Sequence, residues 1–166
     1  MKQTVLSLLV ENTSGVLSRV AGLFSRRGYN IDSLTVGVTK DPNFSRMTVA
    51  VTGDDQIIEQ IKKQLEKLED VIEISELEDG KSVCRELVLV KVQADKKEKQ
   101  ELIATAGVFR ANIVDVAPNS LMIELTGNQN KIEAFLDLLE GFEIQQIVRT
   151  GVTGLSRGSF LKETNE

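Results

Sequence analysis

The sequence predicts an α+β protein made of two βαββαβ units in tandem. Short apolar runs of strand length alternate with longer stretches whose apolar residues recur at helical spacing. The order of strand, helix, strand, strand, helix and strand occurs twice, on either side of a polar break at Asp79–Ser82. Local likeness supports the repeat, because Asn30-Ile31 is echoed by Asn112-Ile113 and Thr52-Gly53 by Thr126-Gly127.

The first half begins with a strand and a helix. The apolar run Val5–Val10 predicts a strand, and the polar segment Glu11–Gly15 ends it. In the following stretch the apolar residues share one helical face, and these are Val16, Leu17, Val20, Ala21, Leu23 and Phe24. Gly28 and Asn30 tolerate the left-handed backbone that closes helices, so we expect this helix to end there.

Two strands, a second helix and a fourth strand complete the first unit. Alternating apolar residues predict strands at Leu34–Val38 and Met47–Val51, joined by turn residues at Lys40–Asn43. Asp54-Asp55 can cap the second helix. Its apolar face holds Ile57, Ile58, Ile61, Leu65 and Leu68. Val71–Ile74 reads as the last strand, which gives the ferredoxin-like order.

The second half repeats this order. Strands are expected at Leu87–Val92, at Ile113–Val116 and Leu121–Leu125 in a hairpin, and at Ile144–Val148. The two helix faces hold Leu102, Ile103, Ala106 and Phe109, and Ile132, Phe135, Leu136 and Leu139. The repeated pairs are offset by 82 and 74 positions, so the first hairpin is predicted to be 8 residues longer. We therefore expect domains at residues 1–78 and 79–166.

Each predicted unit leaves one face of its sheet without helices. Each also has fewer than about 90 residues, a size at which a single hydrophobic core is marginal. Pairing with a second copy, through a sheet face or an edge strand, would bury the remaining apolar surface. We therefore expect a homodimer.

Composition argues against several classes of function. The formal net charge of -5 disfavours a general nucleic-acid binder, because such proteins use basic residues to displace counterions from phosphates. RNA-recognition domains share the βαββαβ order, but they stack bases on aromatic side chains, and only 4% of this chain is aromatic. No apolar stretch approaches membrane-spanning length and the N-terminus does not read as a signal peptide. We expect a cytoplasmic protein that binds neither nucleic acid nor membrane.

The chain has no histidine and a single cysteine, Cys84. It therefore lacks the residues for Ser-His-Asp or Cys-His catalytic sites and for zinc sites built from cysteine and histidine. Cys84 is expected near the start of a strand as a small apolar residue. No pair of carboxylates or lysines stands out for catalysis, so we predict no catalytic residue and no metal site. An enzyme in its own right is the rival reading, and free-standing turnover would support it.

One segment has the chemistry to hold a small anionic ligand. Ser14 can cap the first helix, and Gly15 lets a ligand approach the backbone. The first amides of a helix, at Val16 and Leu17, carry the positive end of its dipole and suit a carboxylate. Asn12 can add an amide contact. Spacing alone favours plain helix capping over ligand binding for these residues, and a plain helix exit for Asn30.

The residues themselves resemble a known family along nearly the whole chain. The matching segments are Leu9–Val20, Arg27–Val36, Ser45–Thr48, Arg85–Leu87, Phe109–Val116 and Arg149–Gly158. The first two resemble the ACT domain of the acetolactate synthase (acetohydroxyacid synthase) small subunit, and the others follow in the order of that subunit. The first predicted domain is thus similar to an ACT domain, and the second to the C-terminal ferredoxin-like domain of the small subunit.

This resemblance implies a ligand and a site. Small subunits of this family dimerise through their ACT domains and bind valine at the dimer interface. The family's ligand residues carry over to Asn12 and to the helix start, which comprises Ser14, Gly15, Val16 and Leu17. Asn30 and Ile31 carry over as the contribution of the facing subunit.

The resemblance also implies a partner and an activity. Such subunits activate a catalytic large subunit that carries thiamine diphosphate, Mg and FAD, so no cofactor is expected on this chain. They make that enzyme, a transferase joining two 2-oxo acids with decarboxylation, sensitive to valine feedback in valine, leucine and isoleucine biosynthesis. The alternative is an amino-acid-sensing ACT regulator of a different client enzyme.

Overall fold

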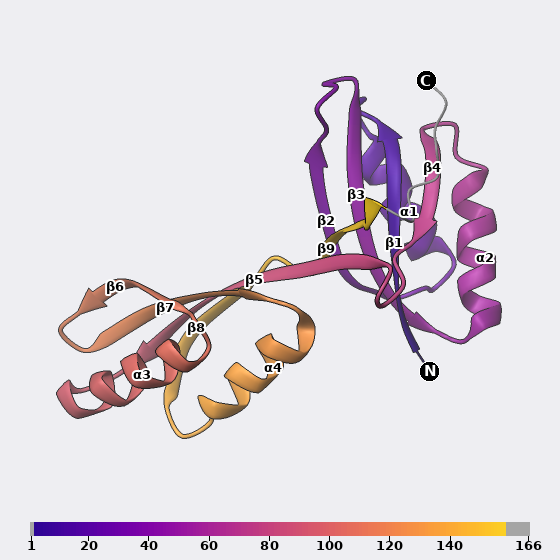
Figure 1. The fold of residues 1–166 in the computed structure, drawn as a ribbon. Helices are drawn as coiled ribbons and strands as arrows, with labels where there is room; N and C mark the ends of the chain where they lie inside the picture. Colours follow the sequence, from indigo (N-terminus) through magenta and orange to yellow (C-terminus); the bar gives the residue numbers. More distant parts are fainter. Residues whose placement is uncertain (1, 159–166) are drawn as a thin grey trace. The chain divides into compact units, whose positions relative to one another are not determined.

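A computed structural model describes residues 2–158 of the chain. These residues form two compact units, residues 2–84 with 151–158 and residues 85–150. Each unit is an antiparallel sheet with two helices, in the βαββαβ order that the apolar periodicity predicts (Figure 1). The α+β class and the tandem ferredoxin-like repeat are therefore confirmed. Within the described residues, no helix combines the length and apolar character needed to span a membrane.

The first unit has a sheet in the order β2-β3-β1-β4. Its elements are β1 (Lys2–Glu11), α1 (Val16–Arg26), β2 (Ile31–Val38), β3 (Phe44–Gly53), α2 (Asp55–Glu66) and β4 (Val71–Glu76). All neighbouring strands are antiparallel. Gly28, at φ 70°, ends the segment after α1, as predicted. The edges of this sheet are β2 and β4.

The second unit repeats the topology as β6-β7-β5-β8. Its elements are β5 (Ser82–Gln93), α3 (Lys96–Val108), β6 (Asn112–Ala117), β7 (Ser120–Gly127), α4 (Gln129–Leu138) and β8 (Glu143–Arg149). Strands β2 and β3 have 8 and 10 residues, whereas β6 and β7 have 6 and 8. The hairpin of the first unit is thus the longer one, as the repeat offset predicts.

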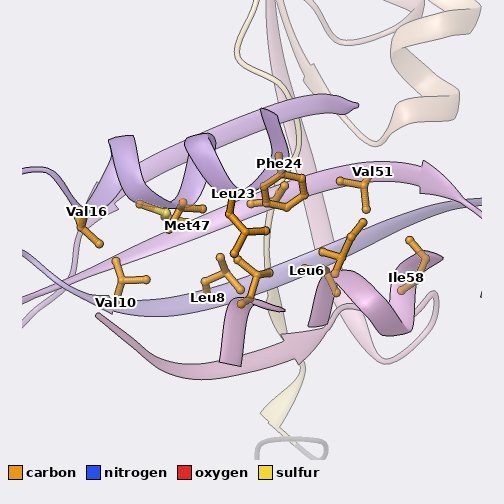
Figure 2. Packing of buried hydrophobic residues seen from close by; sticks show 13 residues of the cluster. Leu6, Leu8, Val10, Val16, Leu23, Phe24, Met47, Val51 and Ile58 are labelled. Carbon is orange, nitrogen blue, oxygen red and sulfur yellow. The ribbon is translucent and has the colours of Figure 1, made fainter. Parts of the chain in front are cut away.

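Each unit has its own hydrophobic core between the sheet and the helices. In the first unit, alternate residues of β1 and β3 pack against apolar residues of α1 and α2 (Figure 2). This cluster comprises Leu6, Leu8, Val10, Val16, Val20, Leu23, Phe24, Met47, Val49, Val51, Ile58, Ile61 and Leu65. In the second unit the side chains of Leu102, Ile132 and Phe135 from the helices pack on Val88, Val90 and Ile123 of the sheet. Both helices of a unit therefore cover the same face, which leaves the opposite, open face without a helix.

The division of the chain differs from the predicted domains in two places. Residues 79–84 belong to the first unit. Strand β5 begins at Ser82, directly after a turn in which Gly80 has φ 79°, so it starts in the first unit and continues into the second. Residues 151–158 also return to the first unit. There the strand β9 (Thr153–Ser156) pairs with β5. We call Gly151–Ser156 the C-terminal strap. Residues 159–166, the end of the predicted second domain, lie outside the described residues.

Candidate functional site

Helix α1 begins without a side-chain cap. Its N-cap residue is Gly15, at φ 85° and ψ -4°, and no side chain accepts a hydrogen bond from the first turn. The prediction that Ser14 caps this helix is therefore wrong. The left-handed turn at Gly15 places the helix start one residue later, so Ser14 precedes the cap and only its carbonyl is used, by Arg19 Nη2 at 3.4 Å.

The other three helices are capped by Asx side chains. Asp54 accepts from the N–H of Ile57 at 2.8 Å, which confirms the cap predicted for α2. Asn128 accepts from Lys131 at 2.9 Å at the start of α4. In α3 a capping box pairs Asp95 and Glu98, and it fills the first turn with acceptors and negative charge. Only α1, among the described helices, keeps an N-terminus suited to an external carboxylate.

The long hairpin of the first unit holds Asn12 in place. The backbone N–H of Asn12 donates to Asn43 O at 2.8 Å, and its side-chain Nδ2 donates to Pro42 O at 2.9 Å. The turn between β2 and β3 therefore positions a predicted ligand residue. In the second unit the equivalent backbone bond joins Ala94 N to Asn119 O at 3.0 Å, and no polar side chain stands at position 94.

Arg19 brings a positive charge to the same end of α1. Its guanidinium binds Asp70 through Nε at 2.5 Å and Nη2 at 3.1 Å. This contact holds the pKa of Asp70 below its usual range, and a hydrogen bond from Thr13 lowers it further. The third nitrogen, Nη1, would stand 2.9 Å from a Cβ placed on Gly15. The start of α1 therefore combines helix amides with a cation held beside them.

The two apolar residues at the helix start face different ways. Val16 is buried in the core, so its side chain is not available to a ligand at the surface. Leu17 is 45% exposed. At the predicted site Val16 thus offers its backbone, and Leu17 offers both backbone and side chain.

Asn30 and Ile31 lie at the far end of α1. The helix runs for 11 residues, which at about 1.5 Å per residue is about 16 Å. Asn30 is exposed just before β2, and Ile31 is half-buried against the core of its own unit. One chain therefore does not bring these two residues to Gly15, so a site that uses both groups needs a second copy.

Sequence reasoning missed Arg19 and Asp70. The spacing of four between Gly15 and Arg19 places the guanidinium over the helix start, and this signal was available in the sequence. The partner was not predictable, because Asp70 is 51 residues away and meets Arg19 only through the pairing of β1 with β4. In the part of the chain that the structure describes, no group of three or more Cys, Asp or Glu residues is arranged to hold a metal ion.

Two family models match the chain, one for each half. Residues 6–73 match the AHAS small subunit-like ACT domain. Residues 85–158 match a model described as the small subunit of acetolactate synthase.

Relatives of known name match over almost the full length. The probable acetolactate synthase small subunit of Methanothermobacter thermautotrophicus is 51% identical, covering 93% of each chain. The acetolactate synthase isozyme 3 small subunit of Escherichia coli is 50% identical over 93% of this chain and 95% of its own. The crystal structure of the small subunit from Thermotoga maritima superposes with a TM-score of 0.86 at 41% identity, covering 95% of this chain and 98% of that one. This chain therefore belongs to the family of acetolactate synthase small subunits.

Proposed function

We propose that this chain activates a thiamine-diphosphate-dependent catalytic subunit and makes it sensitive to valine. Membership of the small-subunit family supports the role of a regulatory partner. The observation that carries the valine site is the uncapped start of α1 at Gly15, in a chain whose other described helices have Asx caps. Thiamine diphosphate, Mg and FAD then belong to the catalytic subunit, and this chain supplies no cofactor and no catalytic residue.

The valine carboxylate binds at the first turn of α1. The N–H of Leu17 lies in this first turn, and that of Val16 makes only a long bond, to Thr13 O at 3.4 Å. The helix dipole favours a negative charge there by about 0.3–1 kcal/mol at an exposed position. Arg19 adds a positive charge beside Gly15. Asn12 lies at the end of β1 with its Nδ2 bound to the hairpin, so its carbonyl oxygen is left to accept from the ligand ammonium.

A homodimer completes the site. Asn30 and Ile31 of one copy approach the α1 start of the other when two first units associate along the edge that β2 presents. Val36 and Val38 on β2 are 46% and 62% exposed, and Leu17 on α1 is also exposed. Burying such apolar side chains contributes about 25 cal/mol per Å² and supports this edge as the dimer contact. The second unit contributes no equivalent ligand site, since its first helix carries a capping box.

Selectivity for valine follows from the small apolar contact at Leu17 and Ile31. A pocket of this kind separates side chains that differ by one methylene by about 1–3 kcal/mol. Leucine and isoleucine are thus expected to bind more weakly, not to be excluded. Because two copies share the ligand, its binding can bias how they pack, and a coupling of about 1–3 kcal/mol is enough for feedback control.

Isothermal titration of the purified chain with valine tests this function. The parent should bind saturably, and Gly15→Asp and Asn30→Ala should each weaken binding while the dimer stays folded. Leucine and isoleucine serve as matched ligands. Activity assays with the catalytic subunit follow, where the parent should raise turnover and valine should lower it again. A folded dimer that binds no valine would contradict the feedback role. Valine binding without any effect on the catalytic subunit would favour the alternative, an ACT regulator of a different client enzyme.

A further inference from the structure

The C-terminal strap is bound to strand β2 of the first unit. Val152 uses both of its backbone groups there, because its N–H donates to Ser33 Oγ at 3.3 Å and its carbonyl accepts from Thr35 Oγ1 at 3.3 Å. Ser33 and Thr35 alternate along β2 and face Ala50 and Thr48 across the β2-β3 ladder, so both hydroxyls lie on the open face. Two side chains of one strand therefore hold a single residue of the strap.

Two glycines let the strap lie this close. Gly151 has φ 82°, and a Cβ there would be 2.6 Å from the Cβ of Ser33. At Gly154 a Cβ would be 2.8 Å from the backbone oxygen of Val83 and 2.7 Å from Cys84 Sγ. The Cβ of Ser33 is fixed to its backbone and the oxygen of Val83 is a backbone atom, so neither can move aside as the end of a flexible side chain can. Larger residues at Gly151 or Gly154 would therefore displace the strap.

The residues at the centre of the first unit's open face are buried. Thr48 and Ala50 on β3 and Ser7 on β1 alternate with core residues, so they face away from the helices, yet they are 2%, 0% and 3% exposed. The open face of the second unit differs. It has a hollow of about 380 Å³ lined by Leu89, Lys91, Met122, Gln146, Ile147 and Val148. In the first unit the strap thus packs on the open face of the sheet.

The strap is bound to β2 and is connected directly, through the chain, to the second unit. Strand β2 begins at Ile31, a proposed ligand residue, and holds the strap two and four residues later. The strap follows β8 of the second unit after Thr150 alone. Thr150 is hydrogen-bonded to Leu87 through its N–H at 3.0 Å and through its Oγ1, which accepts from the N–H of Leu87 at 3.1 Å. Both bonds lie within the second unit, and they hold the residue after which the chain returns to the first unit.

We propose that the strap couples the amino-acid site to the second unit, an inference that rests on the proposed function. Ligand at Ile31 holds β2 in the position that seats Val152 on Ser33 and Thr35. When Val152 is bound to Ser33 and Thr35, the strap fixes Thr150, after which the chain leaves the second unit. Loss of these two hydrogen bonds weakens ligand binding, because the coupling is reciprocal. Residues that touch no ligand, Gly151 and Val152, thereby set the valine response.

The test uses the full chain with Gly151→Ala, which removes the space against Ser33, and with the Ser33→Ala/Thr35→Val pair, which removes both hydroxyls without adding volume. Gly107→Ala on α3 is the control, since a Cβ there meets nothing within 4 Å. The affinity for valine, measured by titration, should be lower by about tenfold or more in both strap variants and unchanged in the control. Amide exchange of residues 144–156 should slow with valine in the parent and not in the variants.

Two results would overturn the inference, and they are distinguishable. If the strap variants bind valine and inhibit the catalytic subunit as the parent does, the inferred coupling is wrong and the proposed function stands. A parent that binds no valine would remove both. If Gly151→Ala does not fold, as thermal unfolding would reveal, the hydroxyl pair decides the question alone.

Discussion

The guanidinium of Arg19 grips the carboxylate of Asp70 with two nitrogens, at 2.5 and 3.1 Å, at the point where β1, α1 and β4 meet. The backbone carbonyl of Asp70 also accepts from the N–H of Glu11 at 2.9 Å. One residue before β4 thus holds both the end of β1 and the cation beside the start of α1. The candidate site is supported from outside the segment that forms it.

The Arg19–Asp70 pair should make stability depend on pH. The pKa of Asp70 is lowered in the folded chain, so the pair stabilises fully above the pKa of an unfolded aspartate, about 3.9. The contribution is lost as pH falls through the lower folded value. The Tm of the parent should exceed that of Asp70→Asn at neutral pH, and the gap should shrink below about pH 4. Asp137→Asn, at an exposed position of α4, is the control. A gap that stays constant down to acid pH would count against the pair.

Gly15→Ala should weaken both the helix start and ligand binding. At φ 85° an alanine is strained, at a cost of about 1 kcal/mol, and its methyl would lie 2.9 Å from Arg19 Nη1. Valine titration should give an affinity about tenfold lower, or about 1.4 kcal/mol. Gly22→Ala in the same helix is the control, since a methyl there meets only the exposed Arg26 side chain, at 3.2 Å. Equal affinities for the two variants would separate Gly15 from the site.

The ion pair of Glu86 and Arg149 should contribute more to the free energy of unfolding than the contact of Arg149 with the exposed Glu133. Arg149 Nε donates to the buried Glu86 at 2.6 Å, and its Nη2 also contacts Glu133, which is 49% exposed. Arg149→Ala leaves a buried carboxylate without its cation and should lower the free energy of unfolding by about 1–3 kcal/mol in urea titrations. Glu133→Gln should cost under about 1 kcal/mol. The Glu86→Leu/Arg149→Met double variant should recover part of the loss, and no recovery would contradict the argument.

A charge on the β2 edge should prevent dimerisation. Val38 is 62% exposed on an edge strand, and a lysine there would bury a charge in the proposed interface. Light scattering should give twice the mass of one chain for the parent and the mass of one chain for Val38→Lys. Val108→Lys is the control, because Val108 is 81% exposed on α3, which belongs to the second unit. A dimeric Val38→Lys variant would place the interface elsewhere.

Apolar periodicity predicted most of the fold, because it reports local burial. The strands containing Val5–Val10 and Leu121–Leu125 and the helix face of Phe24 follow from spacing alone. The Asp54 cap and the left-handed Gly28 are also local, since each depends on residues a few positions away. The Ser14 cap failed because a residue-type rule does not say which of two neighbouring positions, 14 or 15, takes the turn.

The candidate site was predictable only in part. Asn12 and Gly15 were named from the chemistry of their segment and from the resemblance, and their role as ligand residues stays a prediction. Arg19 lay within reach of a spacing argument. That Val16 is buried and Leu17 exposed depends on how α1 is rotated on the sheet. The ion pair with Asp70 depends on β4 pairing with β1.

The sequence by itself determined the tandem α+β fold, through local apolar periodicity. It also determined the family, through matching segments that follow one another in the family's order. Only the tertiary structure decided where the last residues belong. Thr153–Ser156 is short and carries no strong pattern, and its strand forms because β5 offers it a partner. The neighbouring Val152 binds Thr35 of β2, which lies 117 residues earlier in the chain. Contacts at such separation are chosen by the packed sheet, not by the segment, and no local pattern records them.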